Sequence, residues 1–400
     1  MKGSTRLCRL IVGLVFIFSG FVKLLAPVGT SLVIKEYLEA FSLSFMSPAA
    51  LVIGVTLSLL EFVTGVALLL RLRIRVFAWV AFLLLAVFTP LTLYLAIFNP
   101  IADCGCFGEA VHLTNWQTFF KNLILFPCAL VIFIFRKKIS EHSYPFWEWV
   151  FVAMFTALAA FILIRTFRVA PLQEFTPYKG GGEITAGTKA VAAPEYDTQF
   201  IYEKDGIKQT FSLENLPDST WTYVDTVTEM VSDGGASASD ADFVIETADG
   251  RNIAEDILRR RNLLLMTVYH PDKFVRRHGV EKIARMRESA LDQGMDFMVV
   301  SPYEIEGLPE ECETALADVK LLMTFNRSNG GVAWLEDGLI VRKWAYPAAS
   351  NPNADYNGGG NPEQEAIFTL NYNRMSLEIL LVVFILLCII KFLVFYNKKE

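Results

Sequence analysis

The stretch Pro48–Leu70 reads PAALVIGVTLSLLEFVTGVALLL, and its one ionisable side chain is Glu61. A helix needs about 20 apolar residues to span a bilayer, so this stretch is long enough to cross a membrane once. Five more stretches of this kind occur, at Leu7–Ala26, Val76–Phe98, Trp116–Phe135, Phe146–Phe167 and Ser376–Tyr396. The chain is 53% hydrophobic over its 400 residues. We therefore predict an α-helical multi-pass membrane bundle with six transmembrane helices.

Basic residues indicate how these six helices are oriented. They gather in the N-terminal tail, in the loops 71–75 and 136–138, and in the tail 397–400. All four segments lie on one side of the membrane if every stretch crosses once. Cytoplasmic loops carry the excess of Lys and Arg in membrane proteins. We therefore expect a bacterial inner (cytoplasmic) membrane protein with both termini in the cytoplasm.

The opposite side then holds the loop before the fourth span and the long segment 170–375. That segment carries 19 Lys and Arg against 33 Asp and Glu. An acidic segment of this kind argues against nucleic acid as a partner, because nucleic acid binding needs positive charge. The expected partners are the lipid bilayer and an extracytoplasmic protein.

Two cysteines lie close together in the loop before the fourth span, which contains Asp103-Cys104-Gly105-Cys106-Phe107-Gly108-Glu109. A disulfide across one residue requires a tight turn, and glycine permits it because it tolerates positive φ. Strained, exposed disulfides are the labile or catalytic ones, so the loop indicates reversible thiol–disulfide chemistry. A fixed loop staple is the alternative. A zinc site is disfavoured because it needs four ligands and only Asp103 and His112 lie nearby.

The loop itself contains no Lys or Arg, and its carboxylates are expected to raise the pKa of the thiols. Thr114 or Asn115 is expected to cap the helix that follows, because both residue types favour the N-cap position. The loop residues expected to support the cysteine pair are Asp103, Gly105, Phe107 and Gly108.

Glu61 is expected to lie roughly 20 Å from the outer end of its span, at 1.5 Å per residue. An ionisable group at such depth is costly and is a functional hypothesis by default. Lys23 is expected near the outer end of the first span, so no cation is predicted at the depth of Glu61. We therefore expect Glu61 to be protonated or hydrogen-bonded to hydroxyl groups. A role in helix packing and a role as a proton relay both remain open.

Beyond the fifth span, Pro171, Pro177 and 180–182 predict a flexible linker. Within residues 27–47, Val33–Phe41 is expected to form a short helix. The segment Ser232–Asp242 is expected to be a mobile loop. The other elements predicted after residue 195 are a hairpin of Phe200–Tyr202 with Gln209–Phe211, a turn at Asp249-Gly250, strand Leu263–Val268, helix Lys273–Gln293, strand Phe297–Val300, a short helix at Pro309–Ala317, strand Lys320–Thr324, and a hairpin of Gly330–Leu335 with Leu339–Lys343. Strands alternating with helices imply an α/β domain.

Residues 5–165 resemble the MauE/DoxX group of redox-associated membrane proteins. The resemblance rests on Ser19-Gly20-Phe21-Val22-Lys23, on Glu61 with Gly65, and most specifically on Asp103–Gly108. It implies a four-helix core that supports extracytoplasmic disulfide or electron-transfer chemistry. The layout also resembles quinone-linked thiol oxidases, which suggests a quinone as cofactor. Those oxidases space their cysteines by two residues rather than one, so quinone use stays open here.

Residues 240–345 resemble the thioredoxin-like fold, with departures at both of its characteristic positions. Where the redox Cys-x-x-Cys follows the first core strand, this chain reads Tyr269-His270-Pro271-Asp272-Lys273. Near the position of the fold's cis-proline it reads Gly330-Gly331-Val332. The resemblance therefore implies an extracytoplasmic α/β domain that has lost its own dithiol. Cys312 is its one cysteine, for which an inert thiol and a resolving role towards the loop pair are the alternatives.

The expected organisation is a five-span membrane domain (1–168), a linker with a β-hairpin (169–239), the thioredoxin-like domain (240–345), an Asn/Gly/Pro-rich linker (346–375), and a last span with a cytoplasmic tail (376–400). We expect an inner-membrane component of thiol–disulfide redox or electron transfer that works with a separate periplasmic thioredoxin-like partner. Its catalytic residues would be Cys104 and Cys106, with Glu61 in support. Whether the chain is an enzyme stays open; if it is, it is a thiol–disulfide oxidoreductase component. The alternative is a non-catalytic scaffold whose acidic domain binds an envelope protein.

Overall fold

The computed structural model describes residues 2–101, 104–139, 145–169, 171–184, 195–204, 207–212, 221–232, 243–351, 353–356 and 360–396. The chain divides into two compact units. The larger combines Met1–Ile184 with Ile245–Glu400, and the smaller is Thr185–Val244.

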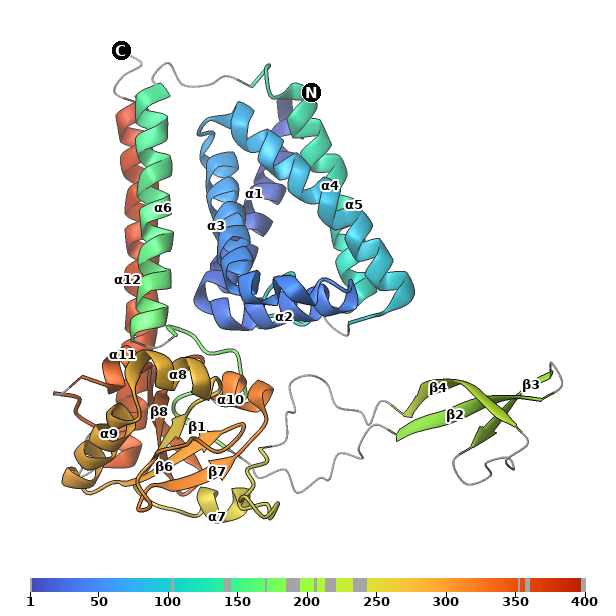
Figure 1. Cartoon of the computed structure of the whole chain (residues 1–400). Helices are drawn as coiled ribbons and strands as arrows, with labels where there is room; N and C mark the ends of the chain where they lie inside the picture. The colour runs from blue at the N-terminus through green and yellow to red at the C-terminus, as the bar shows by residue number, and fades with distance from the viewer. Residues whose placement is uncertain are drawn as a thin grey trace. The chain divides into compact units, whose positions relative to one another are not determined.

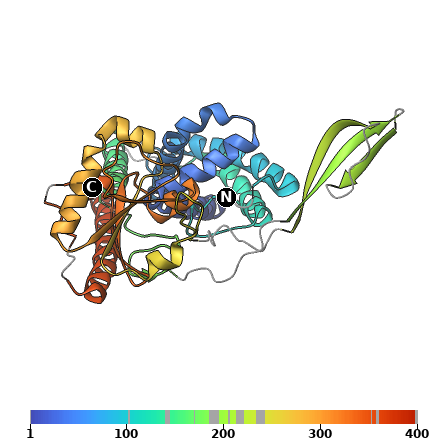
Figure 2. The same ribbon diagram turned by 60° about the horizontal axis from the view of Figure 1, so that its bottom comes forward.

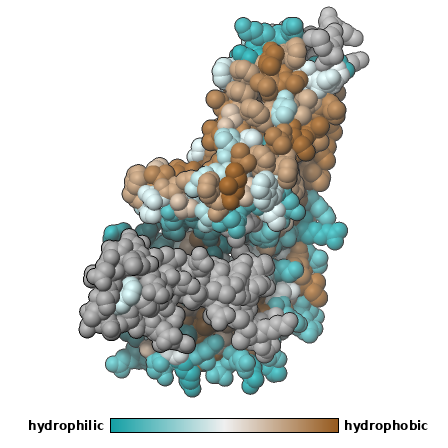
Figure 3. Space-filling view, turned by 90° about the vertical axis from the view of Figure 1, so that its right-hand side faces the viewer, coloured by the Kyte–Doolittle hydropathy of each residue, from teal (hydrophilic) through white to brown (hydrophobic). Residues whose placement is uncertain are grey.

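Six helices of the larger unit are long and apolar enough to cross a membrane, which confirms the prediction of six spans. They are α1 (Lys2–Leu25), α3 (Ala50–Leu70, extended by the 3-10 turn η1, Ser44–Ala49), α4 (Ile74–Phe98), α5 (Asn115–Phe135), α6 (Pro145–Arg168) and α12 (Pro362–Tyr396). The chain begins and ends at the same end of these helices (Figure 1). Their outer surface is dominated by apolar residues (Figure 3), as expected for helices that face lipid.

Helices α1 and α3 approach each other closely through small residues. A Cβ atom added at Gly20 would collide with the backbone of Phe62 on α3. A Cβ atom added at Gly65 would lie 2.6 Å from the backbone nitrogen of Ile17 and 2.7 Å from the carbonyl oxygen of Gly13. Small residues at such crossings let two backbones pack directly, which is how helices associate in lipid. These contacts set the register of α1 against α3.

The remaining helix of this region, α2 (Pro27–Ala40), runs across the end of the other helices (Figure 1). It is longer than the predicted Val33–Phe41, because Pro27 supplies a favourable first helical residue. Thr30, Ser31 and Leu38 are buried against the bundle. The predicted cap of the helix after the cysteine loop is confirmed, since Thr114 forms a capping box with Gln117 at the start of α5.

The α/β part of the larger unit is built on a six-stranded mixed sheet in the order β1-β9-β8-β5-β6-β7. Strands β5, β6 and β7 are parallel to one another, whereas β8 pairs antiparallel with both β5 and β9. The strands are β1 (Gly182–Glu183), β5 (Leu263–Thr267), β6 (Asp296–Ser301), β7 (Glu313–Leu316), β8 (Gly331–Glu336) and β9 (Leu339–Trp344). Helices α8 (Pro271–His278) and α9 (Glu281–Asp292) lie together on one side of the sheet (Figures 1 and 2). Three shorter helices complete this part, α7 (Ala254–Leu258), α10 (Val319–Phe325) and α11 (Tyr346–Ala349).

Several predicted elements of this part are confirmed and others are wrong. The strands near Leu263–Val268 and Phe297–Val300, the turn at Asp249-Gly250 and the hairpin across Asp337-Gly338 are present. The predicted helix Lys273–Gln293 is two helices, α8 and α9, because Gly279 adopts a φ of +76° between them.

The expected helix at Pro309–Ala317 is wrong, because Glu313–Leu316 instead extends the sheet as β7 alongside β6. The expected strand Lys320–Thr324 is the helix α10. The side chain of Asp318 accepts hydrogen bonds from the backbone of Lys320 and Leu321, which is the contact that starts a helix. Short apolar runs do not distinguish a strand from a buried helix.

The predicted flexible linker after the fifth span is also different in the structure. Gly182 and Glu183 form β1, an edge strand paired with β9. Lys343, buried on β9, forms an ion pair of 2.7 Å with Glu174. At the other linker, α12 begins at Pro362, well before the expected start of the last span at Ser376.

The smaller unit contains a three-stranded antiparallel sheet in the order β3-β2-β4. Its strands are β2 (Glu195–Lys204), β3 (Ile207–Ser212) and β4 (Thr222–Ser232). Lys204 pairs with Ile207, so the predicted hairpin is confirmed. The predicted mobile loop Ser232–Asp242 lies outside the described residues, apart from its first residue, which ends β4.

We predict that Gly20→Ala and Gly65→Ala each destabilise the helical part by about 1–3 kcal/mol, because a methyl group at either position overlaps the facing backbone. Gly3→Ala is the matched control, since no atom lies within 4 Å of the added Cβ. The measurement is the free energy of unfolding of the detergent-solubilised protein. Equal stability of all three variants would contradict the close packing of α1 on α3.

Candidate functional site

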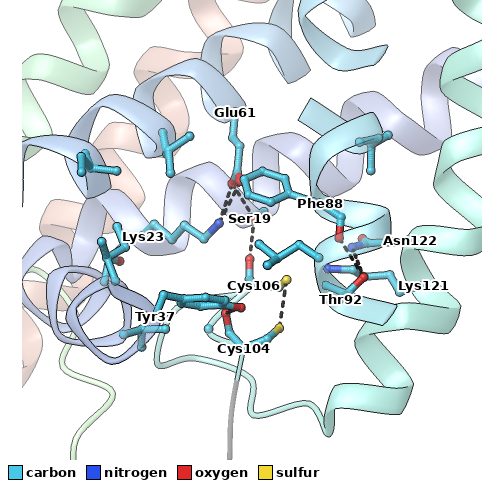
Figure 4. A pocket seen from close by; sticks show the side chains of 18 of the residues that line it. Ser19, Lys23, Tyr37, Glu61, Phe88, Thr92, Cys104, Cys106, Lys121 and Asn122 are labelled. Atoms are coloured by element: carbon cyan, nitrogen blue, oxygen red, sulfur yellow. Dashed lines mark hydrogen bonds and ion pairs between the residues drawn. The ribbon is translucent and has the colours of Figure 1, made fainter. Parts of the chain in front are cut away.

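The two loop cysteines lie side by side at one end of the helices. The Sγ atom of Cys104 lies 3.0 Å from that of Cys106, and both are present as free thiols (Figure 4). Gly105 and Gly108 both adopt positive φ, +61° and +57°, as the predicted tight turn requires. Gly105 also packs against Val33 of α2, which leaves no room for a side chain there.

Hydrogen bonds from three helices hold the loop in place. The Tyr37 hydroxyl of α2 donates to the carbonyl oxygen of Cys104 at 3.1 Å. The Ser19 hydroxyl of α1 lies 2.7 Å from the carbonyl oxygen of Cys106. The Asn115 amide of α5 donates to the carbonyl oxygen of Ile101 at 2.7 Å. The backbone on both sides of Gly105 is therefore fixed by side chains outside the loop.

Glu61 forms a buried ion pair with Lys23, which contradicts the expectation that no cation lies at its depth. The Nζ atom of Lys23 lies 2.9 Å from both carboxylate oxygens of Glu61. Residue spacing along α3 gives the depth of Glu61 but not its neighbours on other helices. The register of α1 against α3 decides which side chains of α1 face Glu61. The same carboxylate lies 2.7 Å from the Ser19 hydroxyl, whose single proton is shared between Glu61 and the carbonyl oxygen of Cys106.

The two thiols are electrostatically unequal. The hydrogen bond that Cys104 donates to Cys106 lowers the pKa of Cys106, with help from the positive charges of Lys121 and Lys23. That same hydrogen bond, together with burial, raises the pKa of Cys104. This arrangement favours a thiolate on Cys106 over one on Cys104. Thiolates are the reactive form of cysteine, so Cys106 is the candidate nucleophile.

Lys121 is a functional candidate that the sequence argument missed. It lies on α5, and its Nζ atom is 4.4 Å from the centre of the Phe107 ring. The loop carboxylates were expected to raise the pKa of the thiols, whereas the pKa of Cys106 is lowered by the hydrogen bond from Cys104 and by Lys121 and Lys23, which lie outside the loop. The signal was present in the sequence as a lysine five residues after Trp116, the expected start of the fourth span.

The other predicted site residues are placed as follows. Phe107 packs edge-on against Phe18 of α1, with the ring centres 5.4 Å apart. Asp103 lies outside the described residues. Glu109 forms a mostly buried ion pair with Arg327. Cys312 is buried in the core of the α/β part, and this burial raises its pKa, which leaves it poorly suited to exchange.

A mostly apolar cavity of about 300 Å³ adjoins the cysteine pair. Side chains from α1 to α5 line it, together with the loop residues 104–106. Among the described residues, no group of three or more His, Cys, Asp or Glu side chains could hold a metal ion. Fold and site thus define a class: a multi-pass membrane protein with two adjacent thiols beside a cavity at one end of its helices.

Comparison with known families agrees with this class. The model of the family described as methylamine utilisation protein MauE matches residues 1–135, which include both cysteines, Lys23, Glu61 and Lys121. A domain of unknown function, DUF8463, matches residues 196–233 in the smaller unit. No curated protein and no solved structure matches the chain.

We predict that Cys106 in the reduced protein is alkylated with an apparent pKa below that of an ordinary thiol, so its reactivity persists to a lower pH and is lost only as the pH drops through that lowered value. Cys104→Ala removes the donated hydrogen bond and should shift the midpoint upward. The measurement is the rate of iodoacetamide modification at each pH, resolved by peptide mass spectrometry. Buried Cys312 is the internal control and should react slowly throughout. A Cys106 midpoint near that of an ordinary thiol in both proteins would contradict the assignment.

We predict that Lys23→Met and Glu61→Leu, made singly, each cost about 3–5 kcal/mol, because each leaves the other charge buried without a partner. The double variant should recover most of that loss. The measurement is the free energy of unfolding in detergent. Additive losses in the double variant would show that the two charges do not stabilise each other.

Proposed function

We propose that the chain is a membrane component of extracytoplasmic thiol–disulfide exchange, with Cys106 as nucleophile and Cys104 as resolving thiol. The observation that carries the proposal is the contact of the two Sγ atoms at 3.0 Å, with Lys121 and Lys23 close enough to stabilise a thiolate on Cys106. Separate roles for two neighbouring thiols are what dithiol exchange requires. The family name refers to methylamine utilisation, and the exchange chemistry is compatible with maturation of an envelope protein.

The exchange step involves one bond formed and one broken at each stage. The Cys106 thiolate attacks a partner disulfide, forms a mixed disulfide, and releases one partner thiolate. Cys104 then loses its proton to that thiolate or to water and attacks the Sγ atom of Cys106. This closes the Cys104–Cys106 disulfide and releases the partner as a dithiol. The reverse sequence oxidises the partner.

The position of the pair supports an extracytoplasmic site. The basic segments 71–75 and 136–138 lie between the second and third spans and between the fourth and fifth. The loop with the cysteines follows the third span, and so belongs to the opposite side. Both chain ends then lie in the cytoplasm.

We further propose that residues 245–345 form a thioredoxin-like domain without its dithiol. The strand order β6-β5-β8-β9, with the first two parallel and the last two antiparallel, supports that relationship. The segment after β5 carries His270, whose backbone exchanges two hydrogen bonds with the side chain of Asn329. This segment has no cysteine, which favours a role in binding a separate thioredoxin-like partner.

We predict that Cys104→Ala accumulates a mixed disulfide through Cys106, because the thiol in contact with Cys106 is then missing and cannot resolve it. Cys106→Ala should accumulate much less, since Cys104 is buried whereas Cys106 is partly exposed, and this burial still raises the pKa of Cys104 in the variant. The measurement is acid trapping of cells with a maleimide reagent, followed by non-reducing gels and mass spectrometry. Cys312→Ala is the matched control and should behave as the unaltered protein does.

A pair that is permanently oxidised in cells, and whose replacement leaves no mixed disulfide and no phenotype, would overturn the proposal. That outcome would favour the non-catalytic alternative, in which the cysteines brace the loop and the chain acts as an assembly scaffold.

A further inference from the structure

A buried hydroxyl group lies against one of the two thiols. The Oγ1 atom of Thr118 on α5 is 3.2 Å from the Sγ atom of Cys104. Thr118 is fully buried and Cys104 is 5% exposed, so the contact is shielded from water. The Thr118 hydroxyl has no other hydrogen-bond partner among the described residues. Its one polar contact is therefore with a sulfur atom of the cysteine pair.

The start of α5 holds Thr118 in this position. Thr114 caps the helix together with Gln117, and the backbone N–H of Thr118 donates to the carbonyl oxygen of Thr114 at 3.0 Å. Asn115, the first residue of α5, donates to the carbonyl oxygen of Ile101 before the cysteines. The chain on both sides of the cysteine turn is thus tied together just ahead of Thr118, which fixes the hydroxyl relative to the turn.

The number of protons decides which group donates in this contact. A thiol and a hydroxyl each carry one proton. In the reduced pair the proton of Cys104 is donated to Cys106, so the Thr118 hydroxyl is the donor to the Sγ atom of Cys104. A Cys104 thiolate, or a Cys104 sulfur within a disulfide, has no proton, so Thr118 is the donor in those states as well. Hydrogen bonds to an ionised group are the stronger ones, so the contact favours the thiolate most.

The electrostatics of Cys104 agree with this direction. The hydrogen bond to Cys106 and burial raise the pKa of Cys104, whereas the contact with Thr118 lowers it. Thr118 is thus a side chain that offsets part of the cost of a negative charge on Cys104.

Both directions of the proposed exchange pass through a Cys104 thiolate. When a partner thiolate attacks the Sγ atom of Cys106 in the closed disulfide, the bond between Cys106 and Cys104 breaks and its electron pair leaves on Cys104. When the mixed disulfide is resolved, Cys104 gives up its proton to water or the partner and then attacks Cys106. A leaving thiol departs faster when its pKa is lower. A donor aimed at Cys104 therefore favours bond breaking at that sulfur.

We propose that Thr118 is a catalytic residue of the exchange, whose hydroxyl stabilises the Cys104 thiolate and thereby directs attack to Cys106. This inference rests on the proposed exchange function and adds the group that decides which sulfur leaves. Exposure acts in the same direction, because Cys104 is buried and Cys106 is partly exposed. Thr118 keeps its own proton throughout, so the step needs no reactant other than the thiols and disulfide of the partner.

The test uses the full-length protein in detergent, with the Cys104–Cys106 disulfide closed and reduced glutathione as the attacking thiol. After an acid quench, peptide mass spectrometry gives the rate of opening and the cysteine that carries glutathione, which should be Cys106. Thr118→Val replaces the hydroxyl by a methyl group and should slow opening about tenfold. Thr118→Ser keeps a hydroxyl and should stay within about threefold of the unaltered protein.

Thr92→Val is the matched control. Thr92 on α4 is 2% exposed and lines the cavity beside the pair, but its hydroxyl donates to the carbonyl oxygen of Phe88 at 2.9 Å. The same chemical change there should leave the opening rate within about twofold. Thr118→Ala is the second variant without the hydroxyl, and it should slow opening as Thr118→Val does although its side chain has a different shape.

Closure provides a readout that a merely structural role would not move. From the protein with glutathione on Cys106, closure requires a Cys104 thiolate, so its rate rises with pH. Loss of the donor raises the pKa of Cys104, so Thr118→Val should need a higher pH to reach the same rate. The loss should be smaller for closure than for opening, because a more basic thiolate is also the better nucleophile.

Three results would each overturn the inference: equal opening rates with and without the Thr118 hydroxyl, glutathione mainly on Cys104, or an equal loss in Thr92→Val. A disulfide that opens at an unchanged rate in Thr118→Val removes only the role of Thr118 and leaves the exchange function standing. A disulfide that glutathione opens in none of the proteins removes both.

Discussion

The close approach of α1 to α3 is the constraint on which the site depends. Gly20 and Gly65 let the two backbones touch, and that contact fixes which side chains of the two helices face each other. Lys23 is thereby brought within 2.9 Å of Glu61, and two charges that would each be costly in lipid neutralise each other. Ser19, one residue before Gly20, connects this pair to the carbonyl oxygen of Cys106. A helix contact thus holds the backbone of the cysteine loop.

The asymmetry of the two thiols follows from this arrangement. The loop alone would give two equivalent cysteines one residue apart, flanked by carboxylates. The surrounding helices add Lys121 on one side and Lys23 on the other. The hydrogen bond that the Cys104 thiol donates favours the negative charge on Cys106. A thiolate and a thiol in contact form the ground state from which dithiol exchange begins. The cavity places this pair beside an apolar space rather than in bulk water.

The α/β part combines a sheet order compatible with thioredoxin-like folds and a segment after β5 that has no cysteine. The backbone of His270 exchanges two hydrogen bonds with the side chain of Asn329. The two adjacent thiols lie in the membrane part, within the residues that match the MauE family model. The proposed exchange therefore assigns its chemistry to the membrane part and the binding of a separate partner to the α/β part.

The sequence by itself determined the six apolar helices, the two hairpins and the cysteine turn. Each of these depends on local properties: run length, a two-residue turn, or a glycine at positive φ. The sequence pattern predicted the wrong secondary structure for α10 and β7. The side chain of Asp318 caps α10 as a helix, and pairing with β6 makes β7 a strand. Only the tertiary structure decided that Lys23 meets Glu61 and that Lys121 lies beside Cys106. Those neighbours belong to different helices, and the offset between helices comes from packing that no single stretch of sequence encodes.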